Sequence, residues 1–148
     1  MQSMKKSHNE IMRKKNLGQR MHNPLNNRYN ALNRWKCLVS ENPSEKVFCR
    51  FTSDEYGLRA AIIILKNYIV RHHIDTPRKI IERWAPPSEN DTELYVAIAC
   101  GRTRLLPDQH LSPDGPELSH LVSAMALQET GMRFVPAYVM QIREDYKI

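Results

Sequence analysis

Apolar residues recur at intervals of three and four over most of this chain, which predicts a mainly helical protein. The longest such pattern runs from about Asp54 to His72 and follows a capping Thr52 or Ser53. The apolar side chains of that stretch would share one core-facing side, and they are Leu58, Ala61, Ile62, Leu65, Tyr68 and Ile69. Alternation of apolar and polar residues at 47–51 predicts one short strand, which could pair with residues 35–39.

Prolines, glycines and capping residues predict shorter helices after the first one. Pro86 disfavours helical backbone at its predecessor, so the helix that Thr76 and Pro77 open should end at about Ala85. The later helices would cover about 91 to 101, 113 or 116 to 131, and 136 to 144, with Gly101 and Gly131 as the closing residues of the first two. We therefore expect a compact domain of five or six helices with at most a small β-hairpin.

Length and composition fit a single domain. A chain of 148 residues with 41% apolar content can bury one core. Its longest apolar run, 60–65, is far too short for a membrane span, and no hydrophobic signal segment follows the first cations, so we expect synthesis in the cytosol. The three cysteines, Cys37, Cys49 and Cys100, form no close pair, which argues for reduced thiols. We expect no metal and no cofactor.

Positive charge is concentrated at the N-terminus. Residues 1–36 hold nine Lys or Arg and one acid, whereas the remainder holds 13 Lys or Arg and 15 acids. Such a segment favours an anionic partner: nucleic acid, an anionic wall polymer or an acidic protein. It is equally well explained as a solvated tail. We expect residues 1–20 to form a basic, partly disordered tail and residues 21–148 to form the domain.

Two polar stretches invite a functional explanation. Residues 21–38 are rich in Asn, which favours an ordered loop that presents amides. Residues 83–92 join two helices through a Trp, a diproline and three polar side chains, more than a turn needs. In both stretches, turn building and helix capping are the competing explanations.

Both stretches and three other segments carry motifs that resemble a phage and prophage family often labelled virion structural protein. The motifs are N-P-L-N-N-R at 23–28, F-C-R-F at 48–51, Y-G-L-R-A at 56–60, R-W-A-P-P-S-E-N-D-T at 83–92, and A-M with E and G over 124–131. The resemblance covers about residues 21–131. Asn27 stands where the family pattern has Ile, and Cys37 where it has Gly, so the loop before the strand could differ.

The same pieces are also similar to those of lysozyme-like glucosaminidases, but in another order. Those enzymes place a helix ending in Glu-x-Gly before an Asn-rich loop, whereas here the Asn-rich loop comes first. The resemblance implies a circularly permuted, lysozyme-like domain. In such a domain residues 113–133 would pack beside residues 23–28.

Glycoside cleavage needs a carboxylic acid that is still protonated near neutral pH. Glu129 is the candidate general acid, because it lies on the core-facing edge of the last turn of its helix, where burial and the helix dipole favour the protonated form. Glu89 could activate water or hold a sugar amide. Their alternatives are an edge Glu paired with Arg133 and a helix cap. The predicted substrate-binding residues are Asn23, Asn26, Arg28, Trp35, Trp84, Ser88, Asn90 and Tyr95.

The resulting hypothesis is a phage-derived enzyme that cleaves peptidoglycan glycan strands as a muramidase, glucosaminidase or lytic transglycosylase. It would be made in the bacterial cytoplasm and would act in the virion or at the cell wall, with virion proteins or an anionic polymer bound through the basic N-terminus. One alternative is a non-catalytic virion structural or host-interaction protein. The other is a nucleic-acid-binding protein that uses the basic N-terminus.

Overall fold

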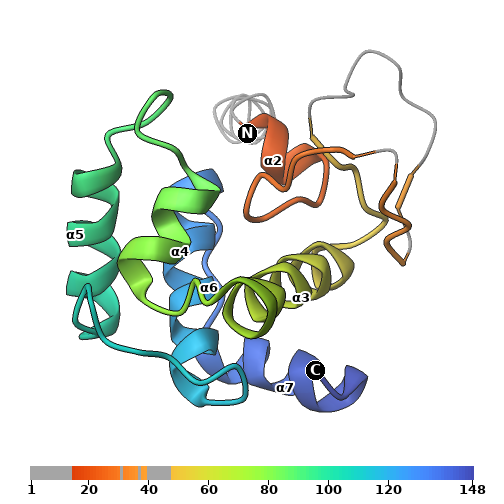
Figure 1. Ribbon diagram of the computed structural model, residues 1–148. Coiled ribbons are helices and arrows are strands. Elements are labelled where there is room, and N and C mark those ends of the chain that lie inside the picture. Colours follow the sequence, from red (N-terminus) through yellow and green to blue (C-terminus); the bar gives the residue numbers. More distant parts are fainter. Residues whose placement is uncertain (1–14, 31, 37, 40–47) are drawn as a thin grey trace, which may run out of the picture.

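The computed structural model describes residues 15–30, 32–36, 38–39 and 48–148, and within them the protein is a single compact, mainly helical domain (Figure 1). The predicted fold class is confirmed in these terms. The helices are α2 (Leu17–Arg20), α3 (Asp54–His72), α4 (Pro77–Trp84), α5 (Thr92–Thr103), α6 (Pro116–Thr130) and α7 (Pro136–Tyr146).

The described residues contain only isolated antiparallel β-bridges, between Arg28 and Phe48 and between Leu38 and Phe51. The second bridge, with the 2.7 Å hydrogen bond from the Val39 amide to the Arg50 carbonyl, pairs the two stretches as predicted. The predicted strand itself was wrong, because residues 48–51 form isolated bridges and no continuous strand. Their connection, 40–47, lies outside the described residues.

Local signals account for most helix ends. Ser53 accepts a hydrogen bond from the Tyr56 amide and caps α3, while Thr76 caps α4, whose first residue is a proline. Gly131 ends α6 with a left-handed φ of 72°, as predicted. The predicted end of α5 was wrong: the helix passes Gly101 and ends at Thr103, and the residue that caps it, Arg104, has a φ of 61°.

The reason for the later end of α5 is tertiary. An added Cβ at Gly101 would meet nothing within 4 Å, so no packing requires a glycine or a turn there. Leu105, directly after the left-handed residue, is buried in the main core. Burial of this residue outweighs the cost of left-handed backbone at a non-glycine position, which is about 1 kcal/mol.

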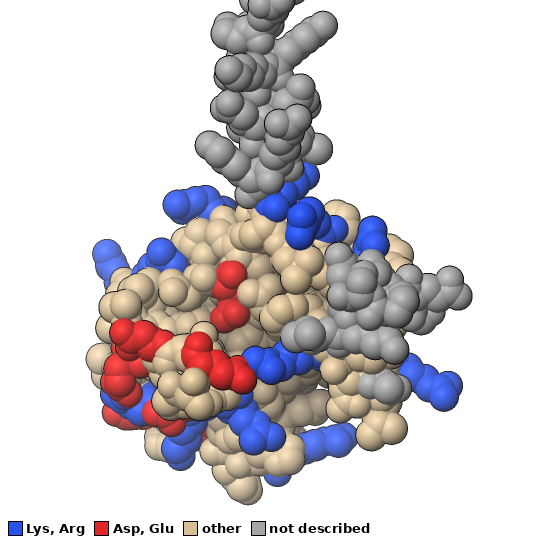
Figure 2. Space-filling view, turned by 90° about the horizontal axis from the view of Figure 1, so that it is seen from above, with Lys and Arg blue, Asp and Glu red and all other residues tan. Residues whose placement is uncertain are grey.

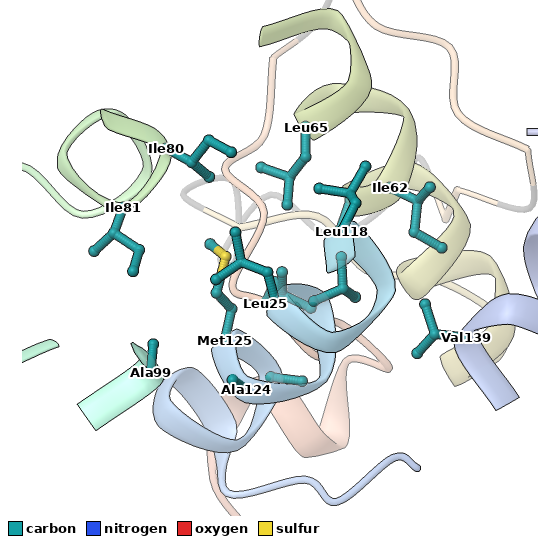
Figure 3. Packing of buried hydrophobic residues seen from close by; sticks show 14 of the residues in the cluster. Leu25, Ile62, Leu65, Ile80, Ile81, Ala99, Leu118, Ala124, Met125 and Val139 are labelled. Carbon is teal, nitrogen blue, oxygen red and sulfur yellow. The ribbon is translucent and has the colours of Figure 1, made fainter. Parts of the chain in front are cut away.

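Helix α6 forms the centre of the main hydrophobic core. Its Leu118, Leu121 and Met125 are fully buried, and α6 packs against α2, α3, α5 and α7. Figure 3 shows Leu25 of the N-terminal loop inserted beside Met125, between side chains of α3 and α4. Helix α6, which carries Glu129 near its C-terminus, is therefore held in place by contacts with these four helices.

A smaller core attaches the Asn-rich region to α3. It consists of Cys49, Phe51 and Ala60, with Trp35 and Tyr56 packed against it, among others. Gly57 permits this arrangement, because a Cβ at that position would lie 2.2 Å from the carbonyl oxygen of His22. None of the helices in the described part of the chain is long and apolar enough to cross a membrane.

Candidate active site

The C-terminus of α6 is capped by side-chain amides from the N-terminal part of the chain. Asn16 Nδ2 and Gln19 Nε2 donate to the Thr130 carbonyl at 2.7 and 2.8 Å, and Asn26 Nδ2 donates to the Glu129 carbonyl at 3.2 Å. The last carbonyls of a helix lack partners within it, so these bonds satisfy groups that would otherwise need water. They also fix α2 and the Asn-rich loop against the end of α6.

The predicted packing of residues 113–133 beside residues 23–28 is confirmed by direct contacts. Besides the Asn26 bond, Thr130 Oγ1 donates to the Pro24 carbonyl at 2.9 Å. Asn26 has a φ of 54°, a left-handed conformation that Asn tolerates better than most residues. This backbone turns its side chain toward α6.

Most of residues 1–20, the expected tail, lies outside the described residues. Its last residues form α2, in which Asn16 and Gln19 make a reciprocal capping box. Gly18 is buried against α6. The division of the chain at residue 21 stays a prediction.

Glu129 lies partly buried where these elements meet. Its Oε1 accepts a hydrogen bond from Asn26 Nδ2 at 3.3 Å. Burial raises the pKa of the carboxyl above its ordinary value, while Asn26, Tyr95 and the charge of Arg28 act in the opposite direction. The carboxyl therefore holds its proton at higher pH than an exposed Glu, which suits a general acid.

Tyr95 of α5 lies behind this carboxyl. It is only 4% exposed, and its hydroxyl has no partner of normal hydrogen-bond geometry in the described residues. Burial and the nearby Glu129 charge both raise the pKa of Tyr95, which therefore stays protonated. The neutral hydroxyl can donate a hydrogen bond to Glu129. The ring is too deeply buried to stack on a sugar.

Glu129 faces a cavity of about 230 Å³ that Glu89 also lines. A second cavity, of about 290 Å³, adjoins it, since both are lined by Asn26, Arg28, Trp84 and Glu89. We call the two cavities together the glutamate groove. Its remaining lining residues are Asn27, Phe48, Ile64, Tyr68, Arg83, Ala85, Pro86 and Asn90.

An ion pair between Arg28 and Glu89 bridges the glutamate groove. The side chains are 61% and 50% exposed, so the pair contributes at most about 1 kcal/mol and opens readily. Figure 2 shows the face seen from above in Figure 1, with Asp and Glu gathered on one side and Lys and Arg around them.

Trp84 fixes one wall of the groove. Its Nε1 donates to the Leu25 carbonyl at 2.8 Å, and its ring meets that of Tyr68 edge to face, with centroids 6.5 Å apart. The following loop is closed by a 2.8 Å bond from Thr92 Oγ1 to the Ala85 carbonyl. Asn90, which lines the groove, donates to the Pro86 carbonyl at 3.3 Å.

Four predicted site residues do not line the groove. Asn23 is buried and builds the loop, since its Nδ2 donates to the carbonyls of Asn27 and Cys49, both at 2.9 Å. Trp35 packs on the smaller core. Tyr95 is buried behind Glu129, and Ser88 is exposed. The structure thus brings together Glu129, Glu89, Asn26, Arg28, Trp84 and Asn90.

Sequence reasoning missed seven lining residues, which are Asn27, Phe48, Ile64, Tyr68, Arg83, Ala85 and Pro86. Phe48 was assigned to a strand and Tyr68 to a core face, while Arg83 belonged to the R-W-A-P-P motif without a role. Of Phe48, Tyr68 and Arg83, only Arg83 had a signal, its place in the motif. Phe48 lies in a loop and Tyr68 lies on α3, and periodicity does not report which side chains the fold turns toward the groove.

Two of the three cysteines lie among the described residues. Cys49 and Cys100 are buried and free, and burial raises the pKa of Cys49 to about 11. Cys37 lies outside the described residues. No group of three or more His, Cys, Asp or Glu side chains in the described ranges could hold a metal ion.

Comparison with known proteins finds a phage protein as a partial homologue. No protein-family profile matches the chain. The chain is similar to "Protein P5" of Pseudoalteromonas phage PM2, with 33% identity over 87 residues, which are 59% of this chain and 53% of P5. The chain thus spans about half the length of that curated relative, and it is a partial homologue of a phage protein.

Proposed function

We propose that this protein cleaves the glycan strand of peptidoglycan, with Glu129 as general acid. The observation that carries the proposal is a partly buried carboxyl with a raised pKa that lines the same cavity as a second carboxylate, Glu89. The similarity to a phage protein supports it, since phages must pass the bacterial wall.

In the proposed reaction Glu129 donates its proton to the glycosidic oxygen as the bond from that oxygen to the anomeric carbon breaks. The leaving sugar keeps the proton and the bonding electrons, and the remaining sugar gains oxocarbenium character. In a muramidase or glucosaminidase, Glu89 would take a proton from the water that attacks the anomeric carbon. In a lytic transglycosylase, a hydroxyl of the same sugar would attack the anomeric carbon instead, and Glu89 would take the proton of that hydroxyl.

The other groove residues would bind the sugar. Asn26 and Asn90 offer amides for N-acetyl groups, and Trp84 offers ring surface at the junction of the two cavities. Substrate would have to displace the Arg28–Glu89 ion pair, which frees Glu89 for its role. The confirmed packing of the Asn-rich loop on α6 supports a circularly permuted, lysozyme-like arrangement.

The test is release of soluble muropeptides from purified peptidoglycan. Glu129→Gln should abolish release, because the amide cannot donate a proton as an acid does. Glu144→Gln is the matched control, since Glu144 is exposed on α7 and lines no part of the glutamate groove. Equal release by the protein and Glu129→Gln would overturn the assignment of the acid.

One observation favours the alternative, a non-catalytic virion or host-interaction protein. Arg28 and Glu89 bridge the groove, so the two groups neutralise each other where a substrate would bind. If the protein is non-catalytic, neither the unsubstituted protein nor Arg28→Ala, which lacks the ion pair, would release muropeptides. The enzymatic proposal predicts release by the unsubstituted protein. Absence of release by the unsubstituted protein and by Arg28→Ala, over a range of pH and with peptidoglycan from several bacteria, would favour the non-catalytic function.

A further inference from the structure

We propose that a second groove, between α5, α6 and the start of α7, binds an acidic segment of another protein. Its cavity of about 430 Å³ shares no lining residue with the glutamate groove. We call it the basic groove. It is lined by Arg102, Thr103, His120, Ser123, Ala124, Leu127, Arg133, Phe134, Val135 and Pro136.

The charge of the basic groove is of one sign. Arg102 and Arg133 are cationic, and the described residues that line the groove include no Asp or Glu. Both arginine side chains are exposed, and neither lies in any ion pair found among the described residues. Their charge is therefore available to a ligand, and the cavity favours carboxylates.

One further feature favours an anionic group in the same groove. Helix α7 begins at Pro136, one of the lining residues. Among the described residues it has no side-chain cap at Val135, and it has no acid in its first turn, so the positive end of its dipole is uncompensated.

Half of the residues that line the basic groove are apolar, and they indicate the class of partner. Ala124, Leu127 and Phe134 are three of them, and Val135 is 67% exposed. The ring of Phe134 stacks on that of Tyr138, with centroids 5.9 Å apart. A nucleic-acid backbone would form ion pairs with the arginines but would leave the apolar side chains exposed to water. A peptide that alternates acidic with aliphatic or aromatic residues would pair with the arginines and also cover the apolar side chains.

The experiment measures binding of short fluorescent peptides to the full chain by anisotropy. The probes are a set in which Asp and Glu alternate with Leu, Val and Phe, and a matched set in which Lys replaces the acids. The acidic set should bind at least about tenfold more tightly than the basic set, a difference of about 1.4 kcal/mol. Added salt should weaken the binding.

Variants locate the binding site. Arg102→Glu combined with Arg133→Glu should weaken binding of the acidic peptides at least about tenfold, because it puts like charges opposite them. Arg71→Glu is the matched control, an exposed arginine on α3 outside both grooves, and should leave binding unchanged. Far-UV circular dichroism with heating checks that each variant is folded.

Three outcomes would overturn the proposal. They are no binding by any acidic probe, equal binding by acidic and basic probes, and equal loss in the control and in the double variant. A single-stranded oligodeoxynucleotide that binds while the acidic peptides do not, and that the double variant loses, would assign the groove to nucleic acid instead.

Discussion

The contact between α2 and α6 can be tested by adding one methyl group. A Cβ at Gly18 would lie 2.3 Å from Thr130 Cγ2 and 2.8 Å from Asn26 Oδ1. Such overpacking costs about 1–3 kcal/mol, whereas replacing Gly by Ala in a helix returns at most about 1 kcal/mol. Gly18→Ala should therefore lower the free energy of unfolding by about 1–2 kcal/mol.

A second substitution relieves part of the overlap. Thr130→Ser removes Cγ2 but keeps the hydroxyl that donates to the carbonyls of Pro24 and Ala126 at 2.9 and 3.0 Å. Alone it should cost about 0.8 kcal/mol for one buried methyl group. In the double variant the Cβ of Ala would occupy the vacated space, so the loss should be about 1 kcal/mol smaller than the sum of the single losses.

Urea unfolding of the four proteins measures this coupling. Losses that add to within about 0.5 kcal/mol would refute the reasoning, because independent sites behave that way. Such a result would mean that α2 does not pack on the end of α6, and the amide bonds that hold the loop beside Glu129 would then lose their support.

Two further predictions concern Trp84 and Glu129. Trp84→Phe should lower the free energy of unfolding by about 1–3 kcal/mol, because it leaves the carbonyl of the buried Leu25 unpaired. Trp35→Phe should cost less, since the buried Trp35 Nε1 has no partner in the described residues. Thermal unfolding measures both losses, and a larger loss for Trp35→Phe would contradict this prediction. Glu129→Gln should become more stable relative to the unsubstituted protein as pH rises. The pKa of Glu129 in the folded protein lies above the ordinary 4.5, so ionisation of this carboxyl lowers the free energy of unfolding as pH rises from 4.5 through the raised value, and Gln cannot ionise. A stability difference between protein and variant that is independent of pH would contradict it.

Much of the fold could be predicted because its helix ends are marked locally. Thr76 and Gly131 act where the sequence predicts, and Ser53 and Pro116 are each one of the two alternatives that the sequence left open. The end of α5 could not be predicted, because burial of Leu105 overrides the glycine signal. Propensity is a weak guide wherever tertiary packing competes with it.

The candidate site could be predicted only in part. The nearness of Asn26 and Glu129 followed from motif order, since nothing in the periodicity links residues 103 positions apart. Asn23 and Asn26 have the same side chain, yet one is buried with backbone partners and the other faces the groove. Which of them serves the loop is decided by the fold and cannot be deduced from residue type.

The most direct test of the central claim follows cleavage of a purified peptidoglycan oligosaccharide by mass spectrometry as a function of pH. The account predicts cleavage that declines as pH rises through the raised pKa of Glu129 and is lost in Glu129→Gln, with product masses that distinguish hydrolysis from anhydro-sugar formation. An intact oligosaccharide at every pH, or cleavage that persists in Glu129→Gln, would contradict it.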